Sequence, residues 1–507
     1  MISPKGQHSG DVSRGERTLT GVPGLDEVLC GGVTPNRLYL LEGAPGTGKT
    51  TLALQFLLDG VAKGEACLYI TLSETAEELR AAAATHGWTL DGLSIFEIVN
   101  EAGLDPDSEQ SILHPSEVEL GETTKGIMER VEQVRPSRLV FDSLSEMRLL
   151  AQNPLRYRRQ ILALKHFFAT RSCTVLMLDD RTSEHGDLQL HSIAHGVISL
   201  EQLPRDFGSE RRRMRVVKMR GIKFRGGYHD FLLDTGGLTI FPRLVAAEHH
   251  RPLPRGVQST GSPELDALLG GGITSSTNTL LMGPSGVGKT TTAVSAMIAA
   301  LRRGERATYY LLDEGTATLV SRSAALGMDL EPYLKAGTLT ILQIDPAELS
   351  PGEFASTVRE AVEVDGSTLI AIDSLNAYLQ AMPGENFLLL QMHELLTYLN
   401  QQGITTLLVL GQHGLIGEMQ SDIDLSYLSD AILLFRYFEA NGEVRTAVSV
   451  VKNRTNVHER TIREFRLDRG GLRVGQVLHD FQGVLTGLPS YRGIVPLLEP
   501  RNDPAKA

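Results

Sequence analysis

The chain has 507 residues, of which 41% are hydrophobic and 22% are charged, and its formal net charge is −12 at pH 7. This length exceeds what a single hydrophobic core supports, so we expect several domains of ordinary globular composition. The acidic balance argues against a protein whose main ligand is nucleic acid, because such proteins usually carry a basic excess or a basic patch.

Three cysteines, Cys30, Cys67 and Cys173, lie far apart and form no CxxC pair. This spacing argues against a disulfide scaffold and a zinc site, and it suits a reducing compartment. Residues 1–17 are polar and lack the apolar segment of a signal peptide. No apolar run approaches the ~18 residues of a membrane span. We therefore expect a cytoplasmic protein with no membrane partner.

The chain contains an internal duplication. Segment 20–34 (TGVPGLDEVLCGGVT) recurs at 260–274 (TGSPELDALLGGGIT), and GAPGTGKT at 43–50 recurs as GPSGVGKT at 283–290. Later landmarks keep the same order, which chance similarity does not preserve. The duplication predicts a disordered tail at 1–17, similar domains at 18–245 and 258–490, a linker at 246–257 and a short tail at 491–507.

Each half alternates short apolar runs with helical patterns. Such runs predict buried strands, and strands that alternate with helices predict a mostly parallel sheet covered by helices. The runs lie at 37–41, 68–70, 139–141 and 174–178 in the first half and at 279–282, 307–312, 368–372 and 405–410 in the second. The predicted fold class is therefore α/β, with two tandem duplicated domains.

Both Gly-rich segments match the GxxxxGK[ST] pattern of a phosphate-binding loop. The glycines leave backbone N–H groups free for phosphate oxygens, the lysine reaches the β- and γ-phosphates, and the final hydroxyl ligates Mg²⁺. Each loop follows a predicted strand and opens a helix, whose N-terminus attracts anions. The predicted nucleotide-binding residues are Gly46, Thr47, Gly48, Lys49, Thr50 and Thr51 in the first half and Gly286, Val287, Gly288, Lys289, Thr290 and Thr291 in the second.

A carboxylate closes a later apolar run in each half. Asp142 and Asp373 stand where a second metal-organising carboxylate belongs in such folds. Together with Thr50 and Thr290 they are the predicted Mg²⁺ ligands. An ordinary polar strand end is the alternative for both aspartates.

Other carboxylates follow the strand that comes directly after the P-loop helix. Glu74 in the first half, and Asp313 and Glu314 in the second, are candidates for the base that orients water or another nucleophile. A surface position or a helix-capping role is the alternative for each.

A Lys-x-Arg pair lies late in each half. Lys218 with Arg220, and Lys452 with Arg454, are candidates to stabilise charge on a transferred phosphate, in cis or from a neighbouring subunit. A solvated strand with alternating cations is the alternative. The run Arg211–Arg213 is predicted to be a solvated hairpin turn and not a nucleic-acid contact.

Together these features resemble the KaiC family over nearly the whole chain, from about residue 18 to residue 490. The resemblance is carried by the doubled P-loop, TG(V/S)P..LD..L..GG before each loop, DSL at 142–144 and 373–375, and the Lys-x-Arg pairs. KaiC proteins are RecA-like ATPases, and the clock members form homohexamers of two stacked rings. The resemblance implies ATP and Mg²⁺ as cofactors, and Lys-x-Arg pairs that reach the neighbouring subunit's nucleotide.

The catalytic Glu-Glu pair of the family falls at Ser73-Glu74 and at Asp313-Glu314. Ser73 cannot act as a base, so the first half keeps one carboxylate of the pair, whereas Asp313 retains a carboxylate. The resemblance therefore implies a competent second half and leaves the rate of hydrolysis in the first half open.

Clock KaiC proteins also autophosphorylate a Ser-Thr pair, which falls at Ser426 and Tyr427 when the following apolar strand is aligned. Ser426 keeps a hydroxyl acceptor, so the resemblance implies a serine autokinase, while a two-site cycle is hard to sustain with Tyr427. The tail after Ser490 is short compared with the tails that bind KaiA in clock members. We expect no dependence on KaiA, and a KaiB-like partner stays open.

Two other functions share this P-loop chemistry. One is a RecA-type DNA-dependent ATPase, recombinase or helicase, against which stand the net charge of −12 and the duplication within one chain. The other is a low-turnover, ATP-gated signalling scaffold, which Ser73 keeps open. ATP turnover with and without DNA distinguishes the three.

Overall fold

A computed structural model describes residues 17–98, 115–151, 153–180, 188–204, 208–249, 256–380, 388–412, 426–440, 442–485 and 490–491. Nearly all of the two predicted tails, and residues 250–255 of the predicted linker, lie outside these ranges. The chain divides into two units, Met1–Arg243 and Leu244–Ala507. Among the described residues, no helix has the length and apolar character needed to cross a membrane.

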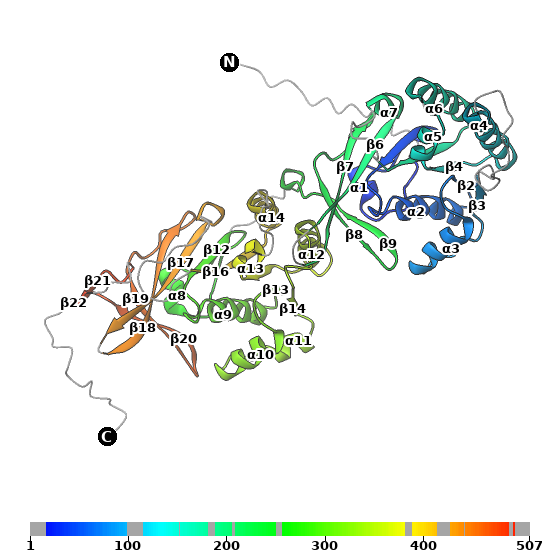
Figure 1. Cartoon of the computed structure of the whole chain (residues 1–507). Helices are drawn as coiled ribbons and strands as arrows, with labels where there is room; N and C mark the ends of the chain where they lie inside the picture. Colours follow the sequence, from blue (N-terminus) through cyan, green and yellow to red (C-terminus); the bar gives the residue numbers. More distant parts are fainter. Residues whose placement is uncertain are drawn as a thin grey trace, which may run out of the picture. The chain divides into compact units, whose positions relative to one another are not determined.

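Unit 1 is built on a nine-stranded sheet with the order β3-β2-β4-β5-β1-β6-β7-β8-β9 (Figure 1). Pairs from β3 to β6 are parallel, and pairs from β6 to β9 are antiparallel. The strands are β1 Leu38–Glu42, β2 Cys67–Thr71, β3 Ser94–Glu97, β4 Arg138–Asp142, β5 Thr174–Asp179, β6 Gly196–Leu203, β7 Arg211–Met219, β8 His229–Asp234 and β9 Gly237–Phe241. The helices are α1 Leu25–Val28, α2 Lys49–Ala62, α3 Ala76–Thr85, α4 Pro115–Val134, α5 Leu144–Ala151, α6 Pro154–Ala169 and α7 Leu188–Ile193.

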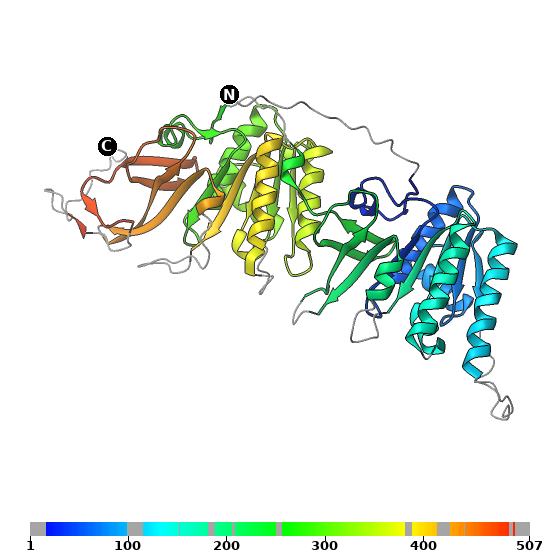
Figure 2. The ribbon, with the colours of Figure 1, turned by 90° about the horizontal axis from the view of Figure 1, so that it is seen from above.

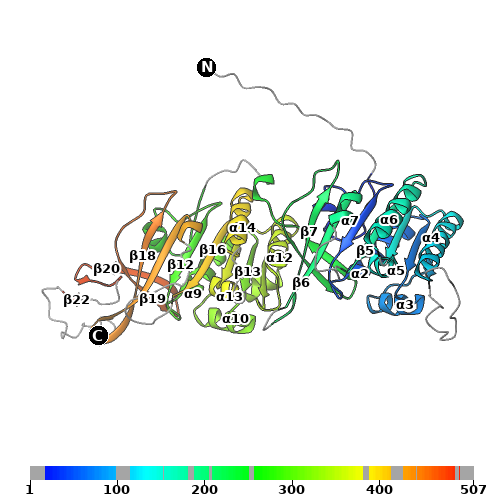
Figure 3. The same cartoon turned by 45° about the horizontal axis from the view of Figure 1, so that its top comes forward.

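Unit 2 repeats this topology in a sheet with the order β14-β13-β15-β16-β12-β17-β18-β19-β20, in which β18–β20 form the antiparallel extension (Figure 3). Its strands are β12 Asn278–Gly283, β13 Ala307–Leu311, β14 Leu339–Gln343, β15 Leu369–Asp373, β16 Thr405–Gly411, β17 Ala431–Ala440, β18 Glu443–Asn453, β19 Arg463–Asp468 and β20 Gly471–Val477. Two small pairs are β10 Val257–Gln258 with β11 Ile273–Thr274, and β21 Phe481–Gln482 with β22 Ser490–Tyr491. The helices are α8 Pro263–Leu268, α9 Lys289–Arg302, α10 Thr316–Ala325, α11 Glu331–Lys335, α12 Pro351–Glu363, α13 Leu375–Gln380 and α14 Leu388–Gln402, with short 3₁₀ helices η2 Ala246–Glu248 and η3 Ser426–Leu428.

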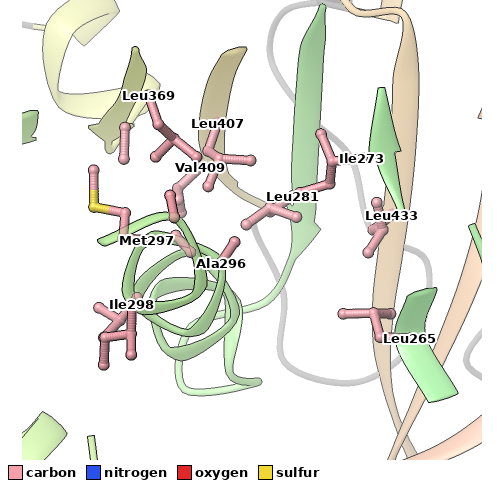
Figure 4. Close-up of a cluster of buried hydrophobic side chains, with 14 of the residues drawn as sticks. Leu265, Ile273, Leu281, Ala296, Met297, Ile298, Leu369, Leu407, Val409 and Leu433 are labelled. Atoms are coloured by element: carbon pink, nitrogen blue, oxygen red, sulfur yellow. The ribbon is translucent and has the colours of Figure 1, made fainter. Parts of the chain in front are cut away.

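Helices cover both faces of each parallel sheet. In unit 1, Tyr39 and Leu41 pack with α2, whereas Leu38 and Leu40 face α4–α6. In unit 2, Leu281, Leu407 and Val409 meet α9 (Figure 4). The helices α12–α14 lie over the other face, yellow in Figure 2. Because both faces are buried, these strands have continuous apolar sequences instead of alternating ones.

The predicted α/β class and the mostly parallel sheets are confirmed, and every predicted apolar run coincides with a strand to within one residue. The prediction of a hairpin turn at Arg211–Arg213 is wrong, because these residues begin β7. Arg211 is buried, and its guanidinium pairs with Asp230 at 3.0 Å. Pairing with β6 and this buried ion pair fix the segment as a strand.

The predicted linker begins with residues that pack on unit 2. Ala246 lies in a core of that unit, and its N–H donates to Glu394 Oε2 at 3.1 Å. The Gln402 amide donates to the carbonyl of His249 at 3.0 Å. The boundary between the units therefore lies at Arg243/Leu244, just before the predicted linker.

Candidate functional site

The second P-loop connects β12 to α9 at the carboxyl edge of its sheet. Gly288 (φ 103°) caps α9 and Gly286 has φ 77°, and such left-handed conformations favour glycine. Lys289 is buried, and its ammonium donates to the carbonyls of Gly283 at 2.9 Å and Pro284 at 2.7 Å. Burial lowers the pKa of Lys289 to about 8, although Asp373 and Asp313 oppose the shift. A desolvated cation in a loop of free N–H groups suits a phosphate ligand.

A hydrogen bond joins the hydroxyl that follows the P-loop lysine to the aspartate at the end of β15. Thr290 Oγ1 donates to Asp373 Oδ2 at 2.7 Å, and the Tyr309 hydroxyl donates to the same oxygen at 2.7 Å. Burial raises the pKa of Asp373, while these hydrogen bonds oppose the rise. Hard oxygen donors of this kind fit Mg²⁺, which usually takes one or two protein ligands and completes its shell with water and phosphate oxygens. The described residues contain no group of three or more His, Cys, Asp or Glu side chains arranged to hold a metal by themselves.

The two candidate bases of the second half have different partners. Ser374 Oγ donates to Asp313 Oδ2. Arg322 donates to Glu314 Oε1 at 2.6 Å, and the Arg322 side chain is 44% exposed. Burial raises the pKa of Glu314, although Arg322 opposes the shift. Both carboxylates therefore have partners in this state.

These groups share one cavity of about 250 Å³. All residues predicted for the second half's nucleotide, metal and base roles line it, except Val287. The lining residues are Ser285, Gly286, Gly288, Lys289, Thr290, Thr291, Leu311, Asp313, Glu314, Arg322, Asp373, Ser374, Val409, Gly411 and Leu467.

The first P-loop repeats the loop conformation and the lysine contacts of the second. Gly48 (φ 95°) caps α2, and Gly46 has φ 81°. Lys49 donates to the carbonyls of Gly43 at 2.9 Å and Ala44 at 3.0 Å. In addition, its ammonium pairs with Asp180 Oδ1 at 2.8 Å.

The first half also repeats the buried aspartate. The Tyr69 hydroxyl donates to Asp142 Oδ2 at 2.6 Å, and burial raises the pKa of Asp142. Glu74 follows β2, where its backbone N–H donates to Thr71 Oγ1 at 2.9 Å. Burial, and then neighbouring carboxylates that include Asp142, raise the pKa of Glu74. The predicted metal and base residues of this half thus lie at one edge of the sheet.

Several residues near these sites were missed by the sequence analysis. They are Tyr69 and Tyr309, Asp180, Arg322, and Arg212, whose guanidinium donates to the Gly46 carbonyl at 2.8 Å. The tyrosines occupy matching positions of the YITLSE and YYLLDE segments, so the repeat itself contained that pattern. The other three contacts depend on tertiary packing.

The Lys-x-Arg pairs lie at the opposite edge of each sheet. Lys218 on β7 is paired with Val197, at the amino end of β6, and its ammonium donates to the Ala194 carbonyl at 3.0 Å. Lys452 on β18 is paired with Ile432, at the amino end of β17. Each pair therefore lies across the sheet from the P-loop of its own unit.

The candidate phosphoacceptors share this amino edge. Ser426 and Tyr427 lie in η3, just before β17, and Tyr427 is 49% exposed. The Lys452 ammonium donates to the carbonyls of Ser426 and Ser429. Ser426 is therefore next to the second Lys-x-Arg pair and distant from the unit's own P-loop.

A family model for the ATPase KaiC matches residues 18–245 and 258–478. The chain belongs to the KaiC family. A circadian clock protein KaiC3 from Synechocystis sp. is 26% identical over 486 residues, which cover 94% of this chain and 95% of that one. A circadian clock oscillator protein KaiC from Picosynechococcus sp. is 26% identical over 508 residues, covering 97% and 95% of the two chains.

The match to KaiC covers both repeats, so the resemblance seen in the sequence is confirmed. Membership of this ATPase family implies nucleotide binding.

Proposed function

We propose that the protein hydrolyses ATP at P-loops in both units, across interfaces with a second copy of itself, and transfers phosphate to Ser426. The observation that carries this proposal is the placement of each P-loop and each Lys-x-Arg pair at opposite edges of one sheet. Head-to-tail contacts of this kind form a ring when the rotation between copies closes. We expect a homohexamer, the assembly that the resemblance to clock KaiC proteins implies.

The chemistry of the second site supports hydrolysis. Lys289 and the loop N–H groups would hold the triphosphate, while Thr290 and Asp373 would hold Mg²⁺. When bound, Mg²⁺ would neutralise charge on the phosphates. Glu314 is the proposed base. Its raised pKa and its displaceable, half-exposed partner Arg322 suit a carboxylate that accepts a hydrogen bond from the attacking group.

Distance supports a second copy of the chain. The strand β12, with six residues between the two edges, spans roughly 20 Å. Neither Arg454 nor Ser426 can reach a phosphate held at Lys289 of the same unit across that distance. Another copy that docks its amino edge on this P-loop brings both groups to the nucleotide.

Unpaired cations at the amino edge of unit 1 support the same arrangement. Arg37, Lys165 and Arg220 line a cavity of about 270 Å³ there, beside His195, whose pKa is lowered by burial and by the charge of Arg37. Within the described part of the chain, none of these side chains pairs with a carboxylate. Burial, followed by the charge of Arg220, lowers the pKa of both Lys165 and Lys218. Clustered cations of this kind favour an anion supplied from outside the unit.

Phosphopeptide mapping after incubation with Mg·ATP tests the proposal. We expect one phosphate on Ser426, retained in Tyr427→Phe and absent in Ser426→Ala and Glu314→Gln, because Glu314 orients the nucleophile. Intact mass gives the stoichiometry. ATP consumed without any phosphate on the chain would reduce the activity to hydrolysis, and a phosphate that persists in Glu314→Gln would assign the base elsewhere.

A further inference from the structure

The two nucleotide sites differ at the carboxyl end of one strand. Val175 of β5 pairs with Leu38, as Thr406 of β16 pairs with Asn278, so the strands superpose in register. The next landmark agrees: the N–H of Asp180 donates to Ser145 Oγ at 3.1 Å, and the N–H of Gly411 donates to Asn376 Oδ1 at 2.6 Å. Asp180 therefore corresponds to Gly411, which has no side chain.

After β2 and β13 the difference is reversed, because there the second half has the carboxylate that the first half lacks. The first half has Ser73 where the second half has Asp313. The second half thus carries its extra carboxylate just after β13, and the first half carries its extra carboxylate directly after β5. Each site ends with the same number of acidic side chains at these two positions.

Asp180 lies where the terminal phosphate would be held. One carboxylate oxygen contacts the Lys49 ammonium at 2.8 Å, and the side chain is 28% exposed. Ser143 Oγ, next to Asp142, donates to the other oxygen at 3.4 Å. Burial is the main cause of the raised pKa of Glu74 and of Asp142, and the negative charge of Asp180 adds to both shifts. Asp180 is thus close to the phosphate-binding lysine, the metal candidate and the remaining base candidate.

We infer that Asp180 acts beside Glu74 in orienting the attacking water of the first site, as the second carboxylate of the pair that is missing at Ser73. The inference rests on the proposed function. Before ATP binds, Asp180 neutralises the buried Lys49. When the triphosphate takes over Lys49, the Asp180 carboxylate is released beside the terminal phosphate, where it accepts a hydrogen bond from water.

The step is ordinary hydrolysis. The water oxygen forms a bond to the terminal phosphorus, the bond from that phosphorus to the bridging oxygen breaks, and its electron pair leaves with ADP. Both protons of the water end on the inorganic phosphate, one as the O–H that stays on the attacking oxygen and one on another phosphate oxygen. Asp180 fixes the direction of the water lone pair toward phosphorus, and it is neither consumed nor altered.

Asp180→Asn in the full-length protein, with Glu314→Gln to silence hydrolysis at the second site, tests this role. We expect turnover of the first site to fall by about 100-fold. The KM for ATP is expected to stay the same or decrease, because Lys49 loses its internal competitor. Turnover within about threefold of the parent, or a loss that comes with a proportional rise in KM, would overturn the role.

Rescue separates a direct role from a folding defect. Ser73→Asp combined with Asp180→Asn moves the second carboxylate to the position that Asp313 occupies in the second half, and it is expected to restore most of the lost turnover. Asp179→Asn is the matched control, because Asp179 is the adjacent carboxylate but is bound by Arg148 at 3.1 Å. Failure of the rescue, or an equal loss in Asp179→Asn, would also overturn the role.

The outcomes distinguish this inference from the function on which it rests. A parent protein that consumes no ATP at either site contradicts the proposed function. A parent that consumes ATP at its first site while Asp180→Asn has no effect leaves the proposed function intact and removes only Asp180. A first site without turnover, beside an active second site, also removes it.

Discussion

Asp373→Asn is expected to lower Mg²⁺-dependent ATP turnover at the second site by about 100-fold or more, because a metal supplies several kcal/mol of transition-state stabilisation. The amide has the shape of the carboxylate but no charge, so Thr290 and Tyr309 keep a hydrogen-bond acceptor at Oδ. Binding of ATP without Mg²⁺ should change little, since the P-loop is untouched. We define second-site turnover as the part of the total ATP turnover that Lys289→Ala abolishes.

Asp365→Asn is the control for this substitution, because Asp365 is exposed and does not line the second-site cavity. It is expected to behave as the parent protein. Turnover in Asp373→Asn within about threefold of the parent would contradict the assignment of Asp373 as a metal ligand. Phosphate release that is independent of Mg²⁺ in the parent would contradict it as well.

Arg454→Ala is expected to lower second-site turnover by about 100-fold or more, although Arg454 lies across the sheet from the P-loop of its own unit. Mixing Arg454→Ala chains with Lys289→Ala chains should restore activity that neither has alone. In a random ring about one quarter of the interfaces combine an intact P-loop from one chain with an intact arginine from the other.

The control for this mixture is a single chain that carries both substitutions. This chain supplies neither an intact P-loop nor an intact arginine. Mixing it with either single variant therefore gives no complete interface and should restore no second-site turnover. Full activity of Arg454→Ala alone, or an absence of complementation in assemblies shown by mass to contain both variants, would contradict an active site shared between copies.

The sequence was sufficient to predict the parallel part of each sheet. Runs such as 139–141 and 369–372 are apolar throughout because both faces are covered, and the P-loop and the DSL segment mark the ends of two such strands. The repeat strengthened each prediction, because Asp142 and Asp373 occupy the same place in two copies.

The antiparallel extension was harder to predict. Strand β7 begins with three arginines, and these were interpreted as an exposed turn because charge usually marks solvent. The burial of Arg211 depends on its ion pair with Asp230, which lies on the next strand of the same sheet. Contacts of this kind become visible only when the sheet order is known.

The electrostatic difference between the sites was also beyond the sequence alone. Asp180 follows Asp179 in an unremarkable acidic pair, and only the register of β5 against β1 shows that Asp180, and not Asp179, lies on Lys49. In the same way, the opposition of Ser426 and the P-loop follows from the direction of β17 relative to β12, which local patterns do not encode.

The most direct test of ATP hydrolysis at the two P-loops is phosphate release from Mg·ATP by the full-length protein, measured with and without DNA. Wild type, Lys49→Ala, Lys289→Ala and the double variant are compared. We expect steady release that DNA does not stimulate, partial loss in each single variant and complete loss in the double variant. Release that requires DNA, or that persists in the double variant, would contradict a two-site ATPase of this kind.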